Sequence, residues 1–368
     1  MLTKIEITNF KNFNEKILFD LGETKSFEFN KECIKNKIVN KAIIYGENGS
    51  GKSNLGFAIF DIVSHLTDKK HQQHVYENYL NARNIDDVAR FKFEFKFDND
   101  IVIYEYTKIN LDTLKSEKLL INGELFTSID RNKSTIITVN AKGAETLNKD
   151  IGDSKISIIS YIKNNALLEK DKNNKCFMKF LKFVNTMLFF RSLQENTYIG
   201  LEQGTHTIDS DIIKQEHIQE FESFLNEAGI KCKLGKRKID GQDELVFNFG
   251  TKKMPFFEIA SSGTMSLASF YFWFQRLKDN KASFVFIDEF DAFYHHKLSA
   301  LIVKKLKDID AQTILTTHNT SIMSTELLRP DCYYILDNNK IKSLSNSTAK
   351  ELREAHNIEK IYKAGGFV

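Results

Sequence analysis

The chain has 368 residues, 42% of them hydrophobic, and its formal net charge of +3 gives no overall attraction to nucleic acid, although it allows a local basic surface. No apolar run approaches the ~18 residues of a membrane span, and the N-terminus lacks the apolar run of a signal peptide, so we predict a cytoplasmic protein. The cysteines are far apart and form no CxxC pair, which argues against a zinc site or a disulfide framework; they are Cys33, Cys176, Cys232 and Cys332.

The first predicted elements are two strands within residues 2–30 and a buried strand over the apolar run Ala42–Tyr45. That run leads into Gly46–Ser53, which matches GxxxxGK[ST] at every fixed position. Such a loop binds phosphate because its glycines let backbone N–H groups point at phosphate oxygens, while its Lys binds the β- and γ-phosphates and its Ser ligates Mg²⁺. We therefore predict a nucleotide site, with Lys52 on the phosphates and Ser53 on the metal, formed by Gly46, Glu47, Asn48, Gly49, Ser50, Gly51, Lys52, Ser53 and Asn54.

The middle of the chain changes from a strand pattern to a helix pattern. Phenylalanines alternate with charged residues over 91–97, and a polar turn at 98–100 leads into a second apolar run, which predicts an antiparallel hairpin. An apolar stripe at helical spacing then predicts an inserted helical arm over residues 156–226; the stripe contains Phe177, Phe180, Leu181, Val184 and Leu188. The basic cluster Lys231–Lys238 is predicted to be a hairpin whose lysines either face solvent or contact phosphate.

Three further motifs follow in order. Residues 261–266, Ser-Ser-Gly-Thr-Met-Ser, begin a predicted helix whose free N–H groups would attract an anion. The apolar run 283–287 predicts a buried parallel strand ending in two carboxylates, where Asp288 would hold Mg²⁺ and Glu289 would act as general base on water. A parallel strand over 313–317 would place His318 beside the terminal phosphate of the nucleotide.

The order of GENGSGKS, SSGTMSL, FVFIDEFDAFYHH and ILTTHNTSIM resembles the ABC-type ATPase heads of the SMC, RecF and OLD group. The sequence is most similar to the abortive-infection AAA ATPases of bacterial phage defence, and the opening ITNFKNF and closing LREAHNIEKIYKAGGF fit the same group. The resemblance implies an α/β fold, an ABC-type P-loop ATPase head with a mixed sheet, an antiparallel N-terminal lobe and an inserted helical arm. The expected division is 1–155 for the N-terminal lobe, 156–226 for the arm and 227–368 for the C-terminal lobe.

The resemblance also implies roles at a dimer interface. Ser262 and Gly263 would be the signature residues that reach the γ-phosphate held by a second subunit. The loop from Asp291 to His295 would cross the same interface and contact the nucleotide, with His295 standing where many ABC proteins have aspartate. Thr264 and Met265 replace the Gly-Gln of the transporter signature, and for the Q-loop glutamine Gln194 is one candidate.

These features together predict an ATPase that binds ATP and Mg²⁺ and switches between states through a head-to-head homodimer, with higher homo-oligomers as an extension. The leading expectation is a switch or scaffold that controls a separately encoded nuclease or toxin in phage defence, because the chain ends soon after 342–344 without the Toprim domain of OLD nucleases. The main alternative is a RecF-like repair clamp that closes on duplex DNA. A peripheral transporter ATPase is a third reading, which the signature disfavours, and no membrane partner is expected.

Overall fold

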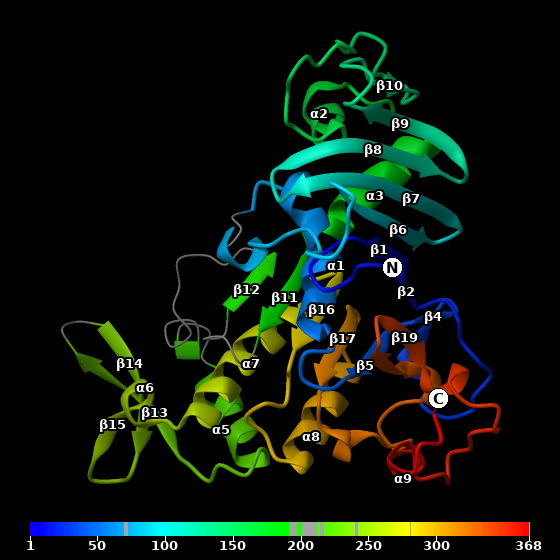
Figure 1. The fold of residues 1–368 in the computed structure, drawn as a ribbon. Coiled ribbons are helices and arrows are strands. Elements are labelled where there is room, and N and C mark those ends of the chain that lie inside the picture. Colours follow the sequence, from blue (N-terminus) through cyan, green and yellow to red (C-terminus); the bar gives the residue numbers. More distant parts are fainter. Residues whose placement is uncertain are drawn as a thin grey trace.

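The computed structural model describes residues 1–69, 73–191, 197–200, 212–213, 217–239, 242–279 and 281–367. Within these residues the fold is organised around two seven-stranded sheets, with a three-stranded sheet at one corner and a short two-stranded ribbon. Figure 1 shows one large sheet above the other, with helices between and below them. No helix in the described ranges is long and apolar enough to cross a membrane.

The upper sheet is antiparallel, with the strand order β10-β9-β8-β7-β6-β1-β2. Alternation explains its one-sided burial, because successive side chains of a strand point to opposite faces; Phe91, Phe93 and Phe95 are buried while the charged residues between them are not. The strands are β1 Leu2–Thr8, β2 Ile17–Asp20, β6 Ala89–Phe97, β7 Asp100–Asn110, β8 Thr113–Ile121, β9 Glu124–Asp130 and β10 Thr138–Val139.

The lower sheet has the order β12-β11-β16-β17-β5-β18-β19, and the strands from β11 to β18 run parallel. Each edge strand is antiparallel to its neighbour. The inner strands β11, β16, β5 and β17 are buried along their whole length, as expected for a sheet covered on both faces. The strands are β5 Lys41–Tyr45, β11 Met187–Arg191, β12 Thr197–Gly200, β16 Phe284–Asp288, β17 Gln312–Thr317, β18 Tyr333–Asp337 and β19 Lys340–Ser343.

Helices α1 and α3 lie between the two large sheets and contact each other. Aromatic contacts join each helix to a sheet: Phe60 of α1 packs on Phe189 of β11 with ring centroids 5.3 Å apart, and Phe180 of α3 packs on Phe95 of β6 at 5.3 Å. The α-helices are α1 Lys52–Leu66, α2 Ile158–Asn165, α3 Lys172–Asn185, α5 Ile218–Glu227, α6 Phe256–Ile259, α7 Ser262–Lys278, α8 His296–Lys307 and α9 Ile358–Lys363.

The remaining elements are small. In the described ranges they are the sheet β13 Leu234–Ile239, β14 Gln242–Asn248 and β15 Lys253–Pro255, the ribbon β3 Ile34–Lys35 and β4 Ile38–Val39, and 3-10 turns at Lys31–Cys33, Gln73–Tyr76, Thr320–Ile322, Pro330–Cys332 and Leu344–Asn346. The predicted hairpin around Lys231–Lys238 is confirmed by the β13–β14 pairing.

The α/β fold class is confirmed, with its mixed sheet and antiparallel lobe, but residues 156–226 differ from the expected helical arm. Helix α3 ends at Asn185, and Leu188 belongs to β11 rather than to the helical stripe. The physical reason is the run Met187–Phe190, which is apolar at every position and therefore fits a strand buried on both faces beside β16. The lower sheet thus takes strands from all three expected segments, and the three-part division stays a prediction.

Candidate functional site

The phosphate loop connects the buried strand β5 to helix α1. Its tight path depends on glycine, because Gly49 and Gly51 have φ angles of 83° and 104°, which other L-residues rarely adopt. The ammonium of Lys52 donates hydrogen bonds to the carbonyl oxygens of Gly46 at 2.8 Å and Glu47 at 3.1 Å. Burial lowers the pKa of Lys52, while the nearby carboxylates of Glu289 and Asp288 oppose that shift. The lysine therefore lies over the loop, within electrostatic reach of the two carboxylates at the end of β16, two strands from β5.

Asp288 ends β16 and is held on both carboxylate oxygens. Ser53 Oγ donates to Oδ2 at 2.6 Å, and Thr316 Oγ1, from β17, donates to Oδ1 at 2.7 Å. The structure thus brings the two expected metal ligands into direct contact although they are far apart in sequence. Both present hard oxygen atoms of the kind that Mg²⁺ prefers. Thr316 was not predicted from the sequence. The pattern that could have indicated it is the pair of threonines at the end of an apolar strand.

Glu289 has an unusual backbone conformation at the end of the same strand. Its φ is +47°, in the left-handed region, and it is not glycine, asparagine or aspartate. The backbone N–H of Glu289 donates to Thr316 Oγ1 at 2.8 Å, which helps to hold this conformation. A strained residue at this position is typical of functional sites, where surrounding contacts keep the backbone in place.

Asp291 follows the carboxyl end of β16, and His318 follows the carboxyl end of β17. Thr317 Oγ1 donates to Asp291 Oδ1 at 2.7 Å, and Asp291 Oδ2 has no partner within the described residues. Burial raises the pKa of the Asp291 carboxyl. With 5% of its surface exposed, Asp291 lies inside the molecule, whereas His318 is exposed directly after β17. The structure therefore brings Asp291 close to β17 and leaves His318 free to meet a ligand.

The signature segment forms the exposed start of α7. Ser261 caps the helix by accepting a hydrogen bond from the Thr264 N–H at 3.2 Å, and Ser262 and Gly263 open its first turn. A Cβ at Gly263 would lie 3.6 Å from the carbonyl oxygen of Phe293, so this turn contacts the loop after β16. In the described part of the chain no hydrogen bond links the start of α7 to the phosphate loop of the same molecule.

The loop after β16 is fixed at both ends. Tyr294 OH lies 2.7 Å from Ser266 Oγ of α7, and His295 caps α8 by accepting from the Leu298 N–H at 3.4 Å. His295 is therefore placed as a helix cap, and no contact of it with the phosphate loop appears among the described residues.

The remaining loop residues differ in exposure. Glu47 and Asn48 are exposed, while Ser50 Oγ is buried without a partner among the described residues. Asn54 Nδ2 donates to Asn12 Oδ1 at 2.7 Å, which ties α1 to the N-terminal turn. Asn12 was not predicted; its signal was its place in the ITNFKNF segment. Gln194 lies outside the described residues.

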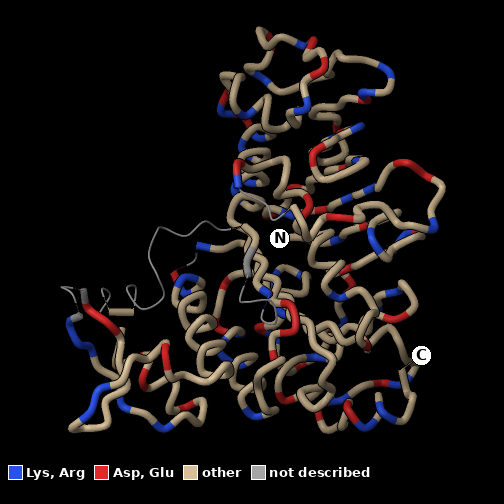
Figure 2. Tube along the Cα trace, turned by 60° about the vertical axis from the view of Figure 1, so that its left-hand side comes forward, with Lys and Arg blue, Asp and Glu red and all other residues tan. Residues whose placement is uncertain are grey.

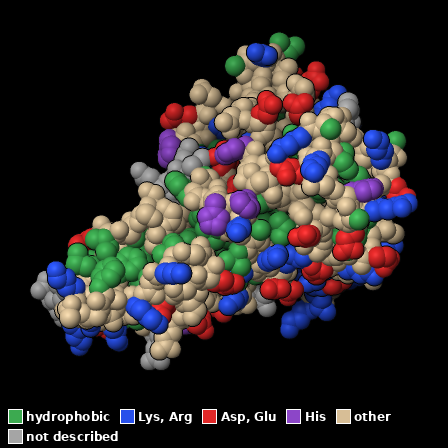
Figure 3. Space-filling model, turned by 90° about the horizontal axis from the view of Figure 1, so that it is seen from below, with side chains coloured by type: hydrophobic (Ala, Val, Ile, Leu, Met, Phe, Trp, Pro, Cys, Tyr) green, Lys and Arg blue, Asp and Glu red, His purple; other side chains and the backbone are tan. Residues whose placement is uncertain are grey.

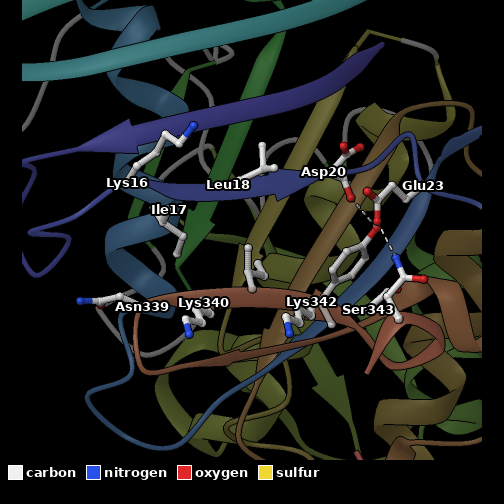
Figure 4. Close-up of a pocket in the computed structure, with 12 residues that line it drawn as sticks. Lys16, Ile17, Leu18, Asp20, Glu23, Asn339, Lys340, Lys342 and Ser343 are labelled. Carbon is white, nitrogen blue, oxygen red and sulfur yellow. Dashed lines mark hydrogen bonds between the residues drawn. The ribbon is translucent and has the colours of Figure 1, made fainter. Parts of the chain in front are cut away.

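A separate groove lies where the edges of the two large sheets meet, between β2 and β19 (Figure 4). It has a volume of about 360 Å³, and none of the predicted nucleotide residues lines it. Tyr334 OH donates to the carbonyl oxygen of Asp20 at 3.0 Å inside the groove. The predicted phosphate-loop residues, Asp288, Glu289 and His318 lie instead at the carboxyl ends of β5, β16 and β17, whereas Ser262, Gly263 and His295 lie at the starts of α7 and α8.

Comparison with known families finds one match, to the model described as "AAA domain, putative AbiEii toxin, Type IV TA system", over residues 41–324. The matched range contains the phosphate loop, the start of α7, β16 and β17. A search of curated proteins finds no match.

Solved structures similar to this chain include SMC heads. One is an SMC head bound to the C-terminal winged-helix domain of ScpA, with 16% identity, 93% of this chain and 96% of that chain covered, and a TM-score of 0.47. A second is the SMC head domain from Thermotoga maritima, with 15% identity, 93% and 97% covered, and a TM-score of 0.44. A third is an Smc head with an extended coiled coil, bound to the C-terminal domain of ScpA derived from Pyrococcus furiosus, with 16% identity, 99% and 98% covered, and a TM-score of 0.46.

Proposed function

The chain belongs to the family described as "AAA domain, putative AbiEii toxin, Type IV TA system", and we propose that it is an ATP-hydrolysing switch in bacterial phage defence. In this proposal the switch controls a separately encoded effector by abortive infection. The family's description supports this role because it names a toxin–antitoxin system. The main support for ATP hydrolysis is the hydrogen bond between Ser53 and Asp288, which connects the phosphate loop to the carboxyl end of β16.

The site has residues for each part of ATP hydrolysis. The loop amides and Lys52 bind the phosphates, and Ser53 and Asp288 would hold Mg²⁺, which supplies positive charge against the phosphate oxygens. Glu289 accepts a proton from the attacking water, and His318 donates a hydrogen bond to the terminal phosphate. Phosphate would replace the carbonyl oxygens of Gly46 and Glu47 as the partner of Lys52, because a charged acceptor forms the stronger hydrogen bond.

A second copy of the chain completes this site in the proposal. The start of α7 presents unpaired amides, and its exposed position suits a γ-phosphate held by another subunit. Exposed apolar side chains flank it, with Phe293 43% and Ile259 44% accessible. Figure 3 shows hydrophobic side chains gathered at the end of the molecule that contains β13–β15 and α6. Exposed apolar clusters mark interaction surfaces, which supports an ATP-dependent homodimer there.

The basic hairpin favours this reading over the DNA clamp. Three of its cations pair with acids: Lys233 with Glu222 at 2.9 Å, Lys236 with Asp243 at 3.4 Å, and Arg237 with Glu244 at 2.9 Å. Figure 2 shows basic and acidic positions together in this corner of the molecule. Because paired cations release fewer counterions on contact with DNA, the hairpin is a weak duplex-binding surface.

The substitution Lys52→Ala tests the ATPase assignment. It removes the cation over the phosphates, so we expect ATP affinity to fall at least about tenfold, the loss typical of a charged hydrogen bond. Isothermal titration with ATP and Mg²⁺ measures the change, and Lys37→Ala, at an exposed turn, is the control. Unchanged ATP affinity in Lys52→Ala would contradict the assignment of the loop.

The effector part needs a separate experiment. Purification of the protein from its native operon, followed by mass spectrometry of the copurifying chains, should identify a partner with nuclease or toxin activity. Nuclease activity that stays with the isolated chain would contradict control of a separate effector. Duplex binding that requires ATP and falls steeply with salt would instead support the clamp.

A further inference from the structure

Arg191 is a buried cation with no counterion among the described residues, and it lies at the carboxyl edge of the lower sheet, beside Asp288. It is the last residue of β11, with 7% of its surface exposed, and its Nε and Nη1 atoms have no hydrogen-bond partner among the described residues. Leaving a buried charged donor unpaired is costly, because the group loses its hydration without gaining a protein partner. An arginine in this state is therefore suited to a ligand that supplies the missing acceptor.

The position of Arg191 within the sheet is set by strand register. Arg191 pairs with Asp288 across the parallel strands β11 and β16, so the two residues end their strands at the same level. Side chains opposite each other on neighbouring strands point to the same face of a sheet. Asp288 bonds Ser53 of α1, and the Arg191 guanidinium lies 4.9 Å from the ring centroid of Phe57, one turn later on the same helix. Both side chains therefore lie between the sheet and α1.

A second cation lies near the same ring. Lys11 Nζ is 5.5 Å from the Phe57 centroid and donates to the carbonyl oxygen of Glu77 at 3.2 Å. Burial and the nearby Arg191 lower the pKa of Lys11. Burial also lowers the pKa of Arg191, against the attraction of Asp288 and Glu289, although neither carboxylate forms an ion pair with it in the described structure. Two neighbouring cations with no ion pair among the described residues favour the binding of an anion at this position.

We propose that Arg191 binds the terminal phosphate of ATP, and this inference rests on the proposed ATPase function. Strand order specifies which phosphate, because the sequence β11-β16-β17-β5 puts Arg191 on the far side of Asp288 from the phosphate loop. The loop after β5 holds the β-phosphate in proteins with this motif, and the metal ligand Asp288 marks the direction of the terminal phosphate. Arg191 lies one strand further in that direction. Its planar fork of N–H donors suits phosphate oxygens.

The test compares a triphosphate with a diphosphate. The variant Arg191→Met keeps a long apolar side chain on Phe57 and removes the charge. We expect the affinity for the non-hydrolysable analogue adenosine 5′-(β,γ-imido)triphosphate to fall roughly 10- to 100-fold, and the affinity for ADP to change less than about twofold. Titration calorimetry with Mg²⁺ measures both. The control Arg90→Met removes an exposed arginine of β6, in the upper sheet, that pairs with Asp86, and it should change neither affinity.

Thermal unfolding without nucleotide gives an independent readout. Removing an uncompensated buried charge should raise the midpoint of Arg191→Met, whereas removing a structural arginine would lower it. The variant Arg191→Lys keeps the charge but loses the fork, so its loss of triphosphate affinity should be smaller than that of Arg191→Met. It also keeps the ligand test available if Arg191→Met folds poorly.

Three outcomes would overturn the inference. Two are an equal loss for both nucleotides and an unchanged triphosphate affinity, in Arg191→Met or, if that variant does not fold, in Arg191→Lys. The third is a lower midpoint in a folded Arg191→Met. If the wild type binds nucleotide and Lys52→Ala does not, these outcomes reject the role of Arg191 alone. If the wild type binds neither nucleotide, the proposed ATPase function and the role of Arg191 are both rejected.

Discussion

Glu289, the proposed general base, has a backbone conformation that stability alone would not favour. Its left-handed φ of +47° costs about 1–2 kcal/mol in a residue with a Cβ, and glycine removes this cost while adding some entropy to the unfolded chain. We therefore predict that Glu289→Gly raises the free energy of unfolding by about 0.5–1 kcal/mol and lowers ATP hydrolysis at least about 100-fold, because the general base is lost. Urea denaturation and a phosphate-release assay measure the two effects.

Lys37 is the matched control for this prediction. It has a φ of +62° in the exposed turn between β3 and β4, away from the predicted nucleotide residues. Lys37→Gly should stabilise the protein by a similar amount and leave hydrolysis unchanged. If Glu289→Gly were less stable than the wild type, the strain would not be real; if it hydrolysed ATP normally, Glu289 would not be the base.

At the level of elements, a buried ion pair joins the helix after the phosphate loop to the antiparallel sheet. Asp61 of α1 and Lys108 of β7 are completely buried and 3.1 Å apart. Asp61 also accepts hydrogen bonds from the hydroxyls of Tyr79 and Tyr106, each at 2.9 Å. We predict that Asp61→Ala lowers the free energy of unfolding by about 3–5 kcal/mol, because it leaves buried Lys108 without its counterion and two tyrosine hydroxyls without their acceptor.

An exposed pair in the same sheet provides the comparison. Lys92 and Glu105 are 3.1 Å apart on β6 and β7, and both side chains are partly open to water. Glu105→Ala should cost less than about 1 kcal/mol. The double variant Asp61→Leu/Lys108→Met should be more stable than Asp61→Ala, since it leaves no buried charge. Equal urea midpoints for Asp61→Ala and Glu105→Ala would contradict the structural role of the buried pair.

The start of α7 can be tested as an element without disturbing its own helix. Ser262→Glu places a carboxylate in the first turn, where the helix dipole tolerates negative charge, but opposite a phosphate held by a second subunit. We predict that the ATP affinity is unchanged, that the ATP-dependent dimer is lost and that ATP hydrolysis falls to the background rate. Titration, light scattering and phosphate release measure these three properties. The control Gln219→Glu makes the same charge change in the first turn of α5 and should alter none of these. Normal dimerisation of Ser262→Glu would reject the signature assignment.

Sequence reasoning could predict those elements whose signals are local. The strand that ends at Asp288 is itself an apolar run, and the loop that ends at Ser53 follows another one. The ends of both could therefore be predicted from the sequence. The strand β11 could not, because a helical stripe at Val184 continues in register to Leu188 and hides the change of element. The partners of Asp61 and the isolation of Arg191 depend on chain segments distant in sequence, which carry no local pattern.

For the whole molecule, the arrangement of the site favours a switch over a simple enzyme. One chain supplies the phosphate loop, both carboxylates and His318, but the start of α7 makes no hydrogen bond to that loop in the described structure. If ATP is needed to join two such surfaces, its hydrolysis separates them, and the two states differ in subunit contact. A ligand can shift this equilibrium only by as much as it favours the joined state. Because hydrolysis removes ATP, the ligand that favours the joined state, it must be blocked to observe that state directly.

The variant Glu289→Gln provides that block, since it keeps the metal ligands and phosphate contacts but lacks the base. We predict that mass photometry shows a monomer without nucleotide and twice that mass with ATP and Mg²⁺, while Glu289→Gln with ADP stays monomeric. The same variant carrying Glu326→Gln, an exposed carboxylate outside the site, should behave identically. A mass that does not depend on ATP would mean that the subunits assemble through another surface, and the exposed apolar side chains near Phe249 would then be the first to replace, because that ring is 65% accessible.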